Sequence, residues 1–160
     1  MLFKIYTDGG FSYIDSVGSW AFIVLNDSMD QCIERAGIVE HHKQTSQVAE
    51  MMAIHNAMEF VYNTLCGSSA KNAKHIDIEL YSDSQYCVNT LNDWMYGWAK
   101  KKWNVDKQNL DLWKPMYDLK HLFKSVKAIW VKGHSGIQYN ERVDELNQIA
   151  LKAHLNEKQK

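Results

Sequence analysis

The order of strand-like and helix-like segments in this 160-residue chain predicts an α/β fold, a mixed five-stranded sheet flanked by helices. Three observations lead to this prediction. Three segments with strand patterns follow one another at the start of the chain, joined by short turns, which is typical of an antiparallel meander. Two later strand segments alternate with helical ones. Acidic side chains end or follow two of the strands, where ligands bind in open α/β sheets.

The first strand is predicted at residues 3–8, Phe-Lys-Ile-Tyr-Thr-Asp, because its side chains alternate between two faces. Two glycines follow Asp8, and we expect them to end the strand and to clear space around its carboxylate. The alternative is that Asp-Gly-Gly is simply a turn. Residues 19–25 and 32–39 supply the second and third strands, with a turn beginning at Asn26 between them.

The first helix is predicted to begin at Thr45 or Ser46 and to reach Leu65, because apolar residues recur at every third or fourth position. Glu50 lies at the margin of that apolar stripe. A glutamate in the first turn of a helix can simply interact favourably with the helix dipole. Its position near the buried edge supports the competing interpretation, in which Glu50 has a role at a site.

Residues 75–81 alternate in polarity and predict a fourth strand, which follows a polar loop at residues 66–72. Asp83 comes directly after this strand and just before a helix. It is therefore either the N-cap of that helix or a second carboxylate at the ligand-binding edge of the sheet. The local sequence leaves both interpretations open.

The segment from Trp94 to Trp103 interleaves aromatic and cationic side chains, with Trp98 and three consecutive lysines at residues 100–102 inside it. Tryptophans four residues apart often pack into a core, and consecutive lysines often form a solvated face. Cationic tips combined with aromatic surfaces are also typical of grooves that bind nucleic-acid phosphates. Core and binding surface both remain possible for this segment.

The remaining elements are a helix at residues 109–125, a short fifth strand at residues 128–131 and a final helix. Pro115 is expected in the first turn of its helix or at a kink. His134 lies between glycines in the loop before the final helix, and Asp144 lies beside the apolar face of that helix. We expect one domain over residues 1–155, followed by a polar, frayed tail at residues 156–160.

Composition and charge exclude several classes of protein. Hydrophobic residues make up 46% of the chain and aromatic residues 12%, which excludes intrinsic disorder. No apolar run approaches the roughly 20 residues of a membrane span, and no signal peptide precedes Phe3, so we expect a soluble cytoplasmic protein without a membrane partner. Cys32, Cys66 and Cys87 are too widely spaced for a disulfide framework or a zinc ribbon. The net charge of −1 means that any nucleic-acid partner must bind a local patch.

Four carboxylates, those of Asp8, Glu50, Asp83 and Asp144, are expected to converge in this fold. Crowded carboxylates repel one another strongly unless cations neutralise them. Ligation by oxygen alone favours Mg²⁺ or Mn²⁺ over zinc. Such a site suits phosphoryl chemistry in which two metal ions stabilise the attacking and leaving oxygens.

Several motifs carry a family resemblance. They are Tyr-Thr-Asp-Gly-Gly at residues 6–10, Ala-Glu-Met-Met-Ala at 49–53, Ser-Asp-Ser-Gln-Tyr at 82–86, and Trp-Val-Lys-Gly-His-Ser-Gly at 130–136 with Asn-Glu-Arg-Val-Asp-Glu-Leu at 140–146. Together they resemble type 1 ribonuclease H over nearly the whole chain, and residues 94–103 resemble the basic protrusion of its bacterial members. The resemblance implies three antiparallel meander strands plus two parallel strands, in a catalytic domain without an added hybrid-binding domain.

The resemblance also implies an activity and a partner. The family cuts the RNA strand of RNA–DNA hybrids and leaves 5′-phosphate and 3′-hydroxyl ends, so we expect a monomeric, metal-dependent endonuclease with two Mg²⁺ ions per site, which Mn²⁺ can replace. Asp8, Glu50, Asp83 and Asp144 match the metal-binding acids, and His134 matches a loop histidine that assists proton transfer or product release. Substrate contacts are expected from Thr45, Ser46, Gln47, Gln85, Trp94, Trp98, Lys100, Lys101, Lys102, Asn109 and Asn140.

Two departures from the family pattern affect substrate contacts more than the acids. Residues 11–16, Phe-Ser-Tyr-Ile-Asp-Ser, replace a glycine-rich turn, and Thr45-Ser46-Gln47 replaces Thr-Asn-Asn. A DNA-strand-transferring or junction-cleaving nuclease on the same fold is a second hypothesis, but it would not need the tryptophan–lysine segment. A hybrid-binding module without activity would not need four intact acids. An aspartyl-phosphate hydrolase usually has a second aspartate where this chain has Gly10.

Overall fold

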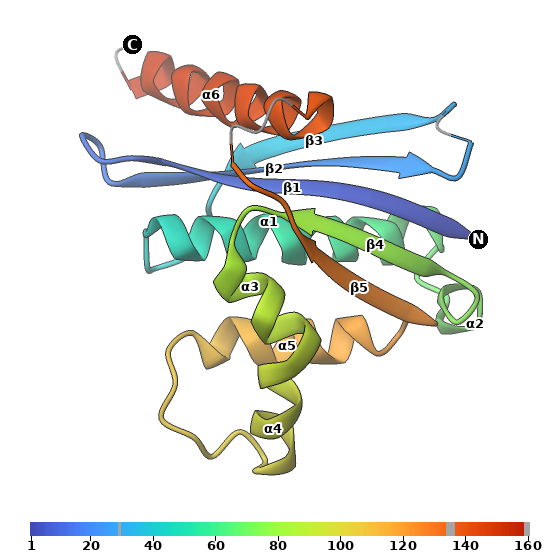
Figure 1. The fold of residues 1–160 in the computed structure, drawn as a ribbon. Helices are drawn as coiled ribbons and strands as arrows, with labels where there is room; N and C mark the ends of the chain where they lie inside the picture. Colours follow the sequence, from blue (N-terminus) through green and yellow to red (C-terminus); the bar gives the residue numbers. More distant parts are fainter. Residues whose placement is uncertain (29, 134–136, 159–160) are drawn as a thin grey trace.

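A mixed five-stranded sheet forms the centre of the protein (Figure 1). The structure is a computed structural model that describes residues 1–28, 30–133 and 137–158. The strands are β1 (Leu2–Ser12), β2 (Val17–Asn26), β3 (Cys32–Ile38), β4 (Asp77–Ser82) and β5 (Ser125–Trp130). They lie in the order β3-β2-β1-β4-β5. The pairs β1–β2 and β2–β3 are antiparallel, and the pairs β1–β4 and β4–β5 are parallel. The predicted fold class is confirmed.

Helices cover both faces of the sheet. They are α1 (Ser46–Phe60) with its π-helical continuation η1 (Val61–Leu65), α2 (Ala70–Ala73), α3 (Gln85–Asn89), the π-helical η2 (Thr90–Trp94), α4 (Met95–Lys100), α5 (Leu110–Lys120) and α6 (Gln138–Lys158). Helix α1 lies against one face and α6 against the opposite face, while α4 and α5 lie beyond α1 (Figure 1). Among the described helices, none combines the length and the apolar character of a membrane span.

The alternation of side chains along β1 builds a separate core on each face. Ile5 is fully buried in the larger core, which it shares with Met51 and Ile54 of α1. The neighbouring Tyr6 faces the other way and packs with Ile23 and with Val143 of α6. This period of two explains why one short strand can hold helices on both sides. Residue 8 is thereby placed between two packed helices.

The segment from α3 to α5 forms a further layer beside α1. Trp113 of α5 is fully buried, and its indole N–H donates a hydrogen bond to the Tyr86 hydroxyl at 3.0 Å. The Lys120 ammonium is buried as well and donates to the Leu91 carbonyl oxygen at 2.5 Å. These buried polar contacts join α5 to α3 and η2, so the segment is packed onto the domain.

Several element boundaries differ from the sequence-based expectation. A short helix, α2, occupies part of the loop expected at residues 66–72, and the helix expected to reach residue 125 ends at Lys120. The fifth strand therefore begins early, at Ser125, where it pairs with Asp77. Pro115 is the sixth residue of α5, beyond the first turn in which we expected it. Helix α6 continues to Lys158, past the predicted start of a frayed tail at residue 156.

Candidate metal centre

Asp8 lies within β1, and the strand does not end there as predicted. Pairing with β2 continues through the glycines to Ser12, whereas pairing with β4 stops at Tyr6. Asp8 is therefore just past the point where β1 and β4 separate. The expectation that the glycines release the chain was wrong because they remain paired in the antiparallel half of the sheet.

Gly9 has a different role, which is to let α1 approach β1. A Cβ atom at this position would overlap the backbone of Ala49 and Glu50. Helix α1 begins after Thr45, whose hydroxyl accepts a hydrogen bond from the Val48 N–H at 3.1 Å, so Thr45 is the N-cap. Glu50 is thus in the second turn, not the first as expected, and beyond the strongest influence of the helix dipole. The close packing directs Glu50 to Asp8.

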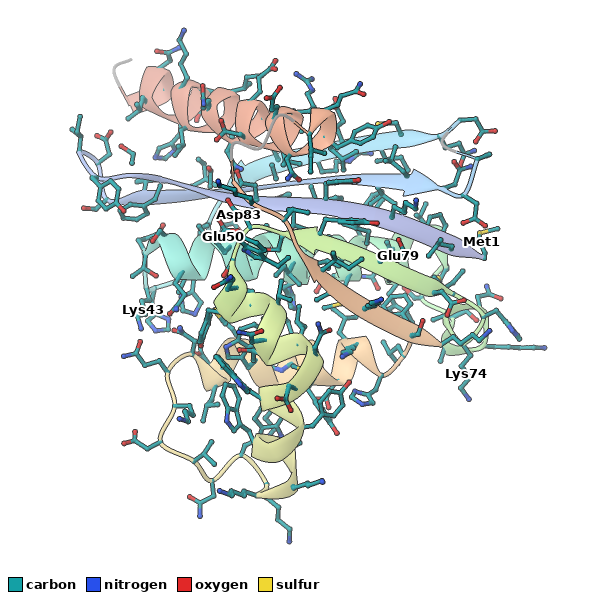
Figure 2. All side chains as sticks on the ribbon, in the orientation of Figure 1. Met1, Lys43, Glu50, Lys74, Glu79 and Asp83 are labelled. Atoms are coloured by element: carbon teal, nitrogen blue, oxygen red, sulfur yellow. The ribbon has the colours of Figure 1, made fainter. Side chains whose placement is uncertain are left out.

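Asp83 directly follows β4, and the alternative that it caps α3 is wrong. The cap is Ser84, whose hydroxyl accepts a hydrogen bond from the Cys87 N–H at 3.2 Å. The Asp83 carbonyl oxygen accepts a bond from the Trp130 indole at 3.1 Å, which fixes the end of β4 against the end of β5. The Asp83 carboxylate lies close to Gly133, where a Cβ would be 3.1 Å from its Oδ2. Figure 2 shows Asp83 and Glu50 approaching one another from their separate elements.

Three of the four predicted acids form a tight cluster. One carboxylate oxygen from each of Asp8, Glu50 and Asp83 lies within 4.8 Å of the other two. Asp144 of α6 is outside this group, but it lines the same cleft, and its charge raises the pKa of Asp8. The cleft has a volume of about 320 Å³ and is lined by Thr7, Asp8, Asp83, Gly133, Asn140, Glu141, Val143 and Asp144.

The electrostatics of the cluster are those of crowded, partly desolvated carboxyls. Burial and then the charge of Asp83 raise the pKa of Asp8 to about 7. Burial, followed by the charges of Asp8 and Asp83, raises the pKa of Glu50 well above its ordinary value. The Gly9 N–H opposes both shifts by donating a hydrogen bond. Ionising all three carboxyls at neutral pH is therefore costly without a cation.

The donor set fits a hard divalent cation. Glu50 Oε2 is buried and, among the described residues, has no hydrogen-bond partner. A buried carboxylate oxygen without a partner is costly unless a cation or proton meets it. Three convergent carboxylates match the oxygen ligands that Mg²⁺ and Mn²⁺ prefer. Asp8, Glu50 and Asp83 could hold such an ion, with Asp144 at the edge of the same cleft.

Two residues that the sequence reasoning did not select also belong to this site. Asn147 is buried in α6, where its amide donates to the Asp8 carbonyl oxygen at 3.0 Å and its Oδ1 accepts from the Ser19 hydroxyl at 2.7 Å. It holds α6 against β1 directly behind Asp8. Glu141 lines the cleft one helical turn before Asp144. Their spacing of three residues from Asp144 was the available signal, because such residues share a helix face.

The predicted substrate residues divide into three groups. At the start of α1, the Asn109 amide donates to Gln47 Oε1 at 3.1 Å, and the Lys43 ammonium donates to Asn109 Oδ1 at 3.3 Å. Asn109 adopts a left-handed conformation (φ 63°), which asparagine tolerates well. Ser46 is exposed beside Gln47 at the start of the helix.

The second group lies near the cleft. Asn140 lines it, and its buried Nδ2 has no hydrogen-bond partner among the described residues. Gln85 is exposed in the first turn of α3, two residues after Asp83. His134 lies outside the described residues, so its predicted role is not addressed by the geometry.

The third group is the tryptophan–lysine segment, which contributes both to the core and to a groove. Trp98 is only 9% exposed and belongs to the larger core, whereas Trp94 is 42% exposed. A groove of about 580 Å³ is lined by Gln47, Tyr86, Asp93, Trp94, Gly97, Trp98, Lys101, Lys107 and Gln108. Lys100 and Lys102 are exposed but do not line it. The groove therefore runs from α4 to the first turn of α1.

Comparison with known proteins agrees with this geometry. A ribonuclease H from Treponema denticola is 35% identical over 157 residues, covering 91% of this chain and 94% of its own. One from Campylobacter jejuni is 32% identical over 150 residues, covering 93% of this chain and 91% of its own.

Solved structures show the same fold. RNase H1 from Halobacterium salinarum, at 20% identity, has a TM-score of 0.70 over 96% of this chain and 99% of its own. The N-terminal RNase H domain of a Mycobacterium tuberculosis protein, 17% identical, gives 0.68 over 98% and 97%. The RNase H family model matches residues 2–152. The chain therefore belongs to the ribonuclease H family of nucleases.

Proposed function

We propose that this protein hydrolyses the RNA strand of RNA–DNA hybrids with two Mg²⁺ ions, leaving 5′-phosphate and 3′-hydroxyl ends. The observation that carries the proposal is the cluster of Asp8, Glu50 and Asp83, whose ligand atoms lie within 4.8 Å of one another around a buried, unpartnered Glu50 oxygen. The relatives' names and the matching family model support the same activity.

The acids would hold the ions between them, with Asp144 contributing from α6, which lines the same cleft. Bound Mg²⁺ would neutralise charge on the attacking and leaving oxygens of the phosphodiester. The Asn140 amide, which has an unused N–H donor at the cleft, would donate to a sugar or phosphate oxygen of the RNA strand. We also propose that His134 carries a proton to or from the reacting phosphate or its products.

The groove beside α1 would hold the DNA strand. Gln47 lines this groove, and Glu50 lies one turn further along the same helix, so α1 connects the groove to the metal centre. Lys43 and Asn109 present N–H donors at this end of α1, where a phosphate would accept from both. Trp94 and Lys101 would contact the strand further along the groove. The first turn of α1 would then lie between the two strands of the hybrid.

The test is cleavage of end-labelled RNA–DNA hybrid, duplex DNA and duplex RNA, each with and without Mg²⁺. We expect cleavage only of the RNA strand of the hybrid, only with Mg²⁺, and product RNA with a 5′-phosphate that a phosphatase removes. Equal cleavage of duplex DNA, or cleavage unaffected by a chelator, would contradict the proposal. Mn²⁺ in place of Mg²⁺ should restore activity.

We further propose a cytoplasmic monomer. Cys32, Cys66 and Cys87 are free thiols, as expected for a reducing compartment. Size-exclusion chromatography with light scattering should give a mass near the 18.6 kDa of one chain. A mass of twice that value at micromolar concentration would contradict the monomer.

A further inference from the structure

We propose that His41, His42 and Asp111 form a second metal site, which takes Zn²⁺ or a similar borderline ion and is separate from the carboxylate centre. One ligand atom from each of the three side chains lies within 4.8 Å of the other two. The histidines precede α1, and Asp111 is in the first turn of α5. None of them lines the cleft that contains Asp8 and Asp83.

The loop that carries the histidines is held in place by hydrogen bonds. The Gln44 amide donates to the carbonyl oxygens of Val39 and His41, both at 2.9 Å, and Gln44 Oε1 accepts from the Gly18 N–H at 2.8 Å. The backbone of His41 is thereby attached to β2, and its side chain is only 11% exposed. A ligand fixed in this way loses little conformational freedom when a metal binds.

The Nε2 atom of His41 can bind a metal, because a backbone carbonyl lies within reach of the other ring nitrogen, Nδ1. Its Nε2 lies 2.9 Å from Asp111 Oδ2. Its Nδ1 is 3.0 Å from the Lys43 N–H and 3.3 Å from the Lys43 carbonyl oxygen. With a metal at Nε2, the ring proton moves to Nδ1, which then no longer accepts from the Lys43 N–H and donates to the Lys43 carbonyl oxygen instead. A histidine ligand that donates its other N–H to a backbone carbonyl is the usual arrangement in metal sites.

The ligand atoms of His41, His42 and Asp111 favour one class of metal ion over another. Two imidazoles and one carboxylate suit Zn²⁺, whereas Mg²⁺ prefers a site of oxygens alone. His42 is exposed, and its ring lies against that of His41 with centroids 4.1 Å apart, so its nitrogens can turn to the shared position. Three protein ligands leave the fourth tetrahedral position for water.

Metal binding here would tie the loop before α1 to the start of α5. The Lys43–Asn109 hydrogen bond joins the same two segments, since Asn109 is two residues before Asp111. A ligand that binds only the folded state raises its stability by mass action. Zn²⁺ would therefore raise the melting temperature through these three side chains.

The experiment measures binding of Co²⁺ and Zn²⁺ to the Asp8→Asn/Asp83→Asn protein, in which the carboxylate centre is weakened. We expect one ion per chain by isothermal titration calorimetry and the visible absorption of four-coordinate Co²⁺. His42→Ala and Asp111→Asn, both changes of exposed side chains, should each weaken binding at least about tenfold and remove the Zn²⁺-dependent rise in melting temperature. His121→Ala, which changes an exposed histidine at the other end of α5, is the matched control and should bind as before.

Unchanged affinity in His42→Ala and Asp111→Asn would overturn the proposal. So would Co²⁺ binding that is present in the wild type and disappears in the Asp8→Asn/Asp83→Asn protein, because that ion would belong to the carboxylate centre. Neither outcome depends on cleavage of nucleic acid.

Discussion

Asp8 is held by contacts from several elements of the fold. Its backbone carbonyl accepts a hydrogen bond from Asn147, and burial followed by the charges of Asp83 and Asp144 raises the pKa of its side chain. A carboxyl in this position is neutralised either by binding a proton or by binding a cation. At neutral pH without metal, the pKa of about 7 means that a large fraction of Asp8 is protonated.

We predict that Asp8→Asn keeps the fold and removes nearly all Mg²⁺-dependent cleavage. The amide retains the shape of the side chain but supplies no negative charge for the ions. The loss should be at least about 100-fold in kcat/KM. Mutation of a residue that only hydrogen-bonds to a metal ligand already lowers activity by up to about 100-fold, and Asp8 is expected to be a ligand itself. The measurement is steady-state cleavage of a hybrid, with circular dichroism as the check on the fold. Wild-type turnover would disprove the assignment of the acids.

His134→Ala should slow turnover by roughly 10- to 100-fold, the low end for a proton-transfer group. Mg²⁺ affinity should be unchanged, because we expect His134 to move protons and not to bind the ions. The measurement is kcat as a function of Mg²⁺ concentration. Complete inactivity with a raised Mg²⁺ requirement would identify His134 as a ligand instead.

At the scale of elements, the contact between β1 and α1 places Glu50 beside Asp8. Gly9 permits it, since any side chain there would push against the backbone of α1. Asn147 performs the matching function on the other face, where it joins α6 to β1 and, through Ser19, to β2. The metal centre is therefore assembled by the two helices that pack on opposite faces of one strand.

Gly9→Ala should lower the free energy of unfolding by about 1–3 kcal/mol, the usual cost of overpacking, and should reduce cleavage because Glu50 must move. Gly97→Ala is the matched control. A Cβ at Gly97 meets nothing within 4 Å, and the residue is inside α4, so this change should stabilise the protein by about 0.5–1 kcal/mol. Urea denaturation measures both. Equal stability of the two variants would contradict the close approach of α1 to β1.

Lys101 and Lys102 provide a second matched pair. Lys101 lines the groove and Lys102 does not, although both are exposed. Lys101→Ala should weaken hybrid binding and flatten the slope of log affinity against log salt by about 1, the effect of one lost phosphate contact. Lys102→Ala should change the slope less, and kcat at saturating substrate should stay constant in both. Two slopes equal to that of the wild type would show that these lysines are only a solvated surface.

At the scale of the whole molecule, the carboxylate centre lowers the stability of the metal-free protein at neutral and alkaline pH. The folded pKa of Asp8 is about 7 and its ordinary value is 3.8, so the folded state holds a proton that the unfolded state releases. The stabilisation from that proton is fully present below about pH 4 and is lost as the pH rises through about 7.

Metal-free protein should therefore lose stability between about pH 4 and pH 7, by about 1.4 kcal/mol for each unit by which the pKa of Asp8 is raised. Asp8→Asn should be more stable than the wild type at pH 8 in a chelator, and this difference should vanish as the pH falls to about 4. Saturating Mg²⁺ should remove the loss in the wild type. Thermal unfolding across pH, with and without Mg²⁺, is the measurement. A difference between the two proteins that is constant with pH would contradict the raised pKa.

The sequence by itself determined the five strands, the longer helices and three acids, Asp8, Glu50 and Asp83, that share one site. Alternation in residues 3–8 and apolar periodicity after Thr45 are local patterns, and each corresponds to an observed element. Asp8 and Asp83 were recognisable because each lies at the end of a predicted strand, where ligands bind, and Glu50 because it lies at the margin of the apolar stripe of its helix. The Thr45 cap is likewise a local contact, within one turn of its own helix.

Tertiary structure alone decided how those acids are held. Three features depend on residues far apart in the chain. Gly9 accommodates α1, β1 continues past Asp8 by pairing with β2, and Asn147 of α6 donates to the Asp8 carbonyl oxygen. The juxtaposition of His41 with Asp111, 70 positions later, has the same origin. Sequence periodicity reports which face of an element is apolar, but not which other element packs against it. Those contacts, and the pKa shifts that they produce, exist only after the sheet has brought distant segments together.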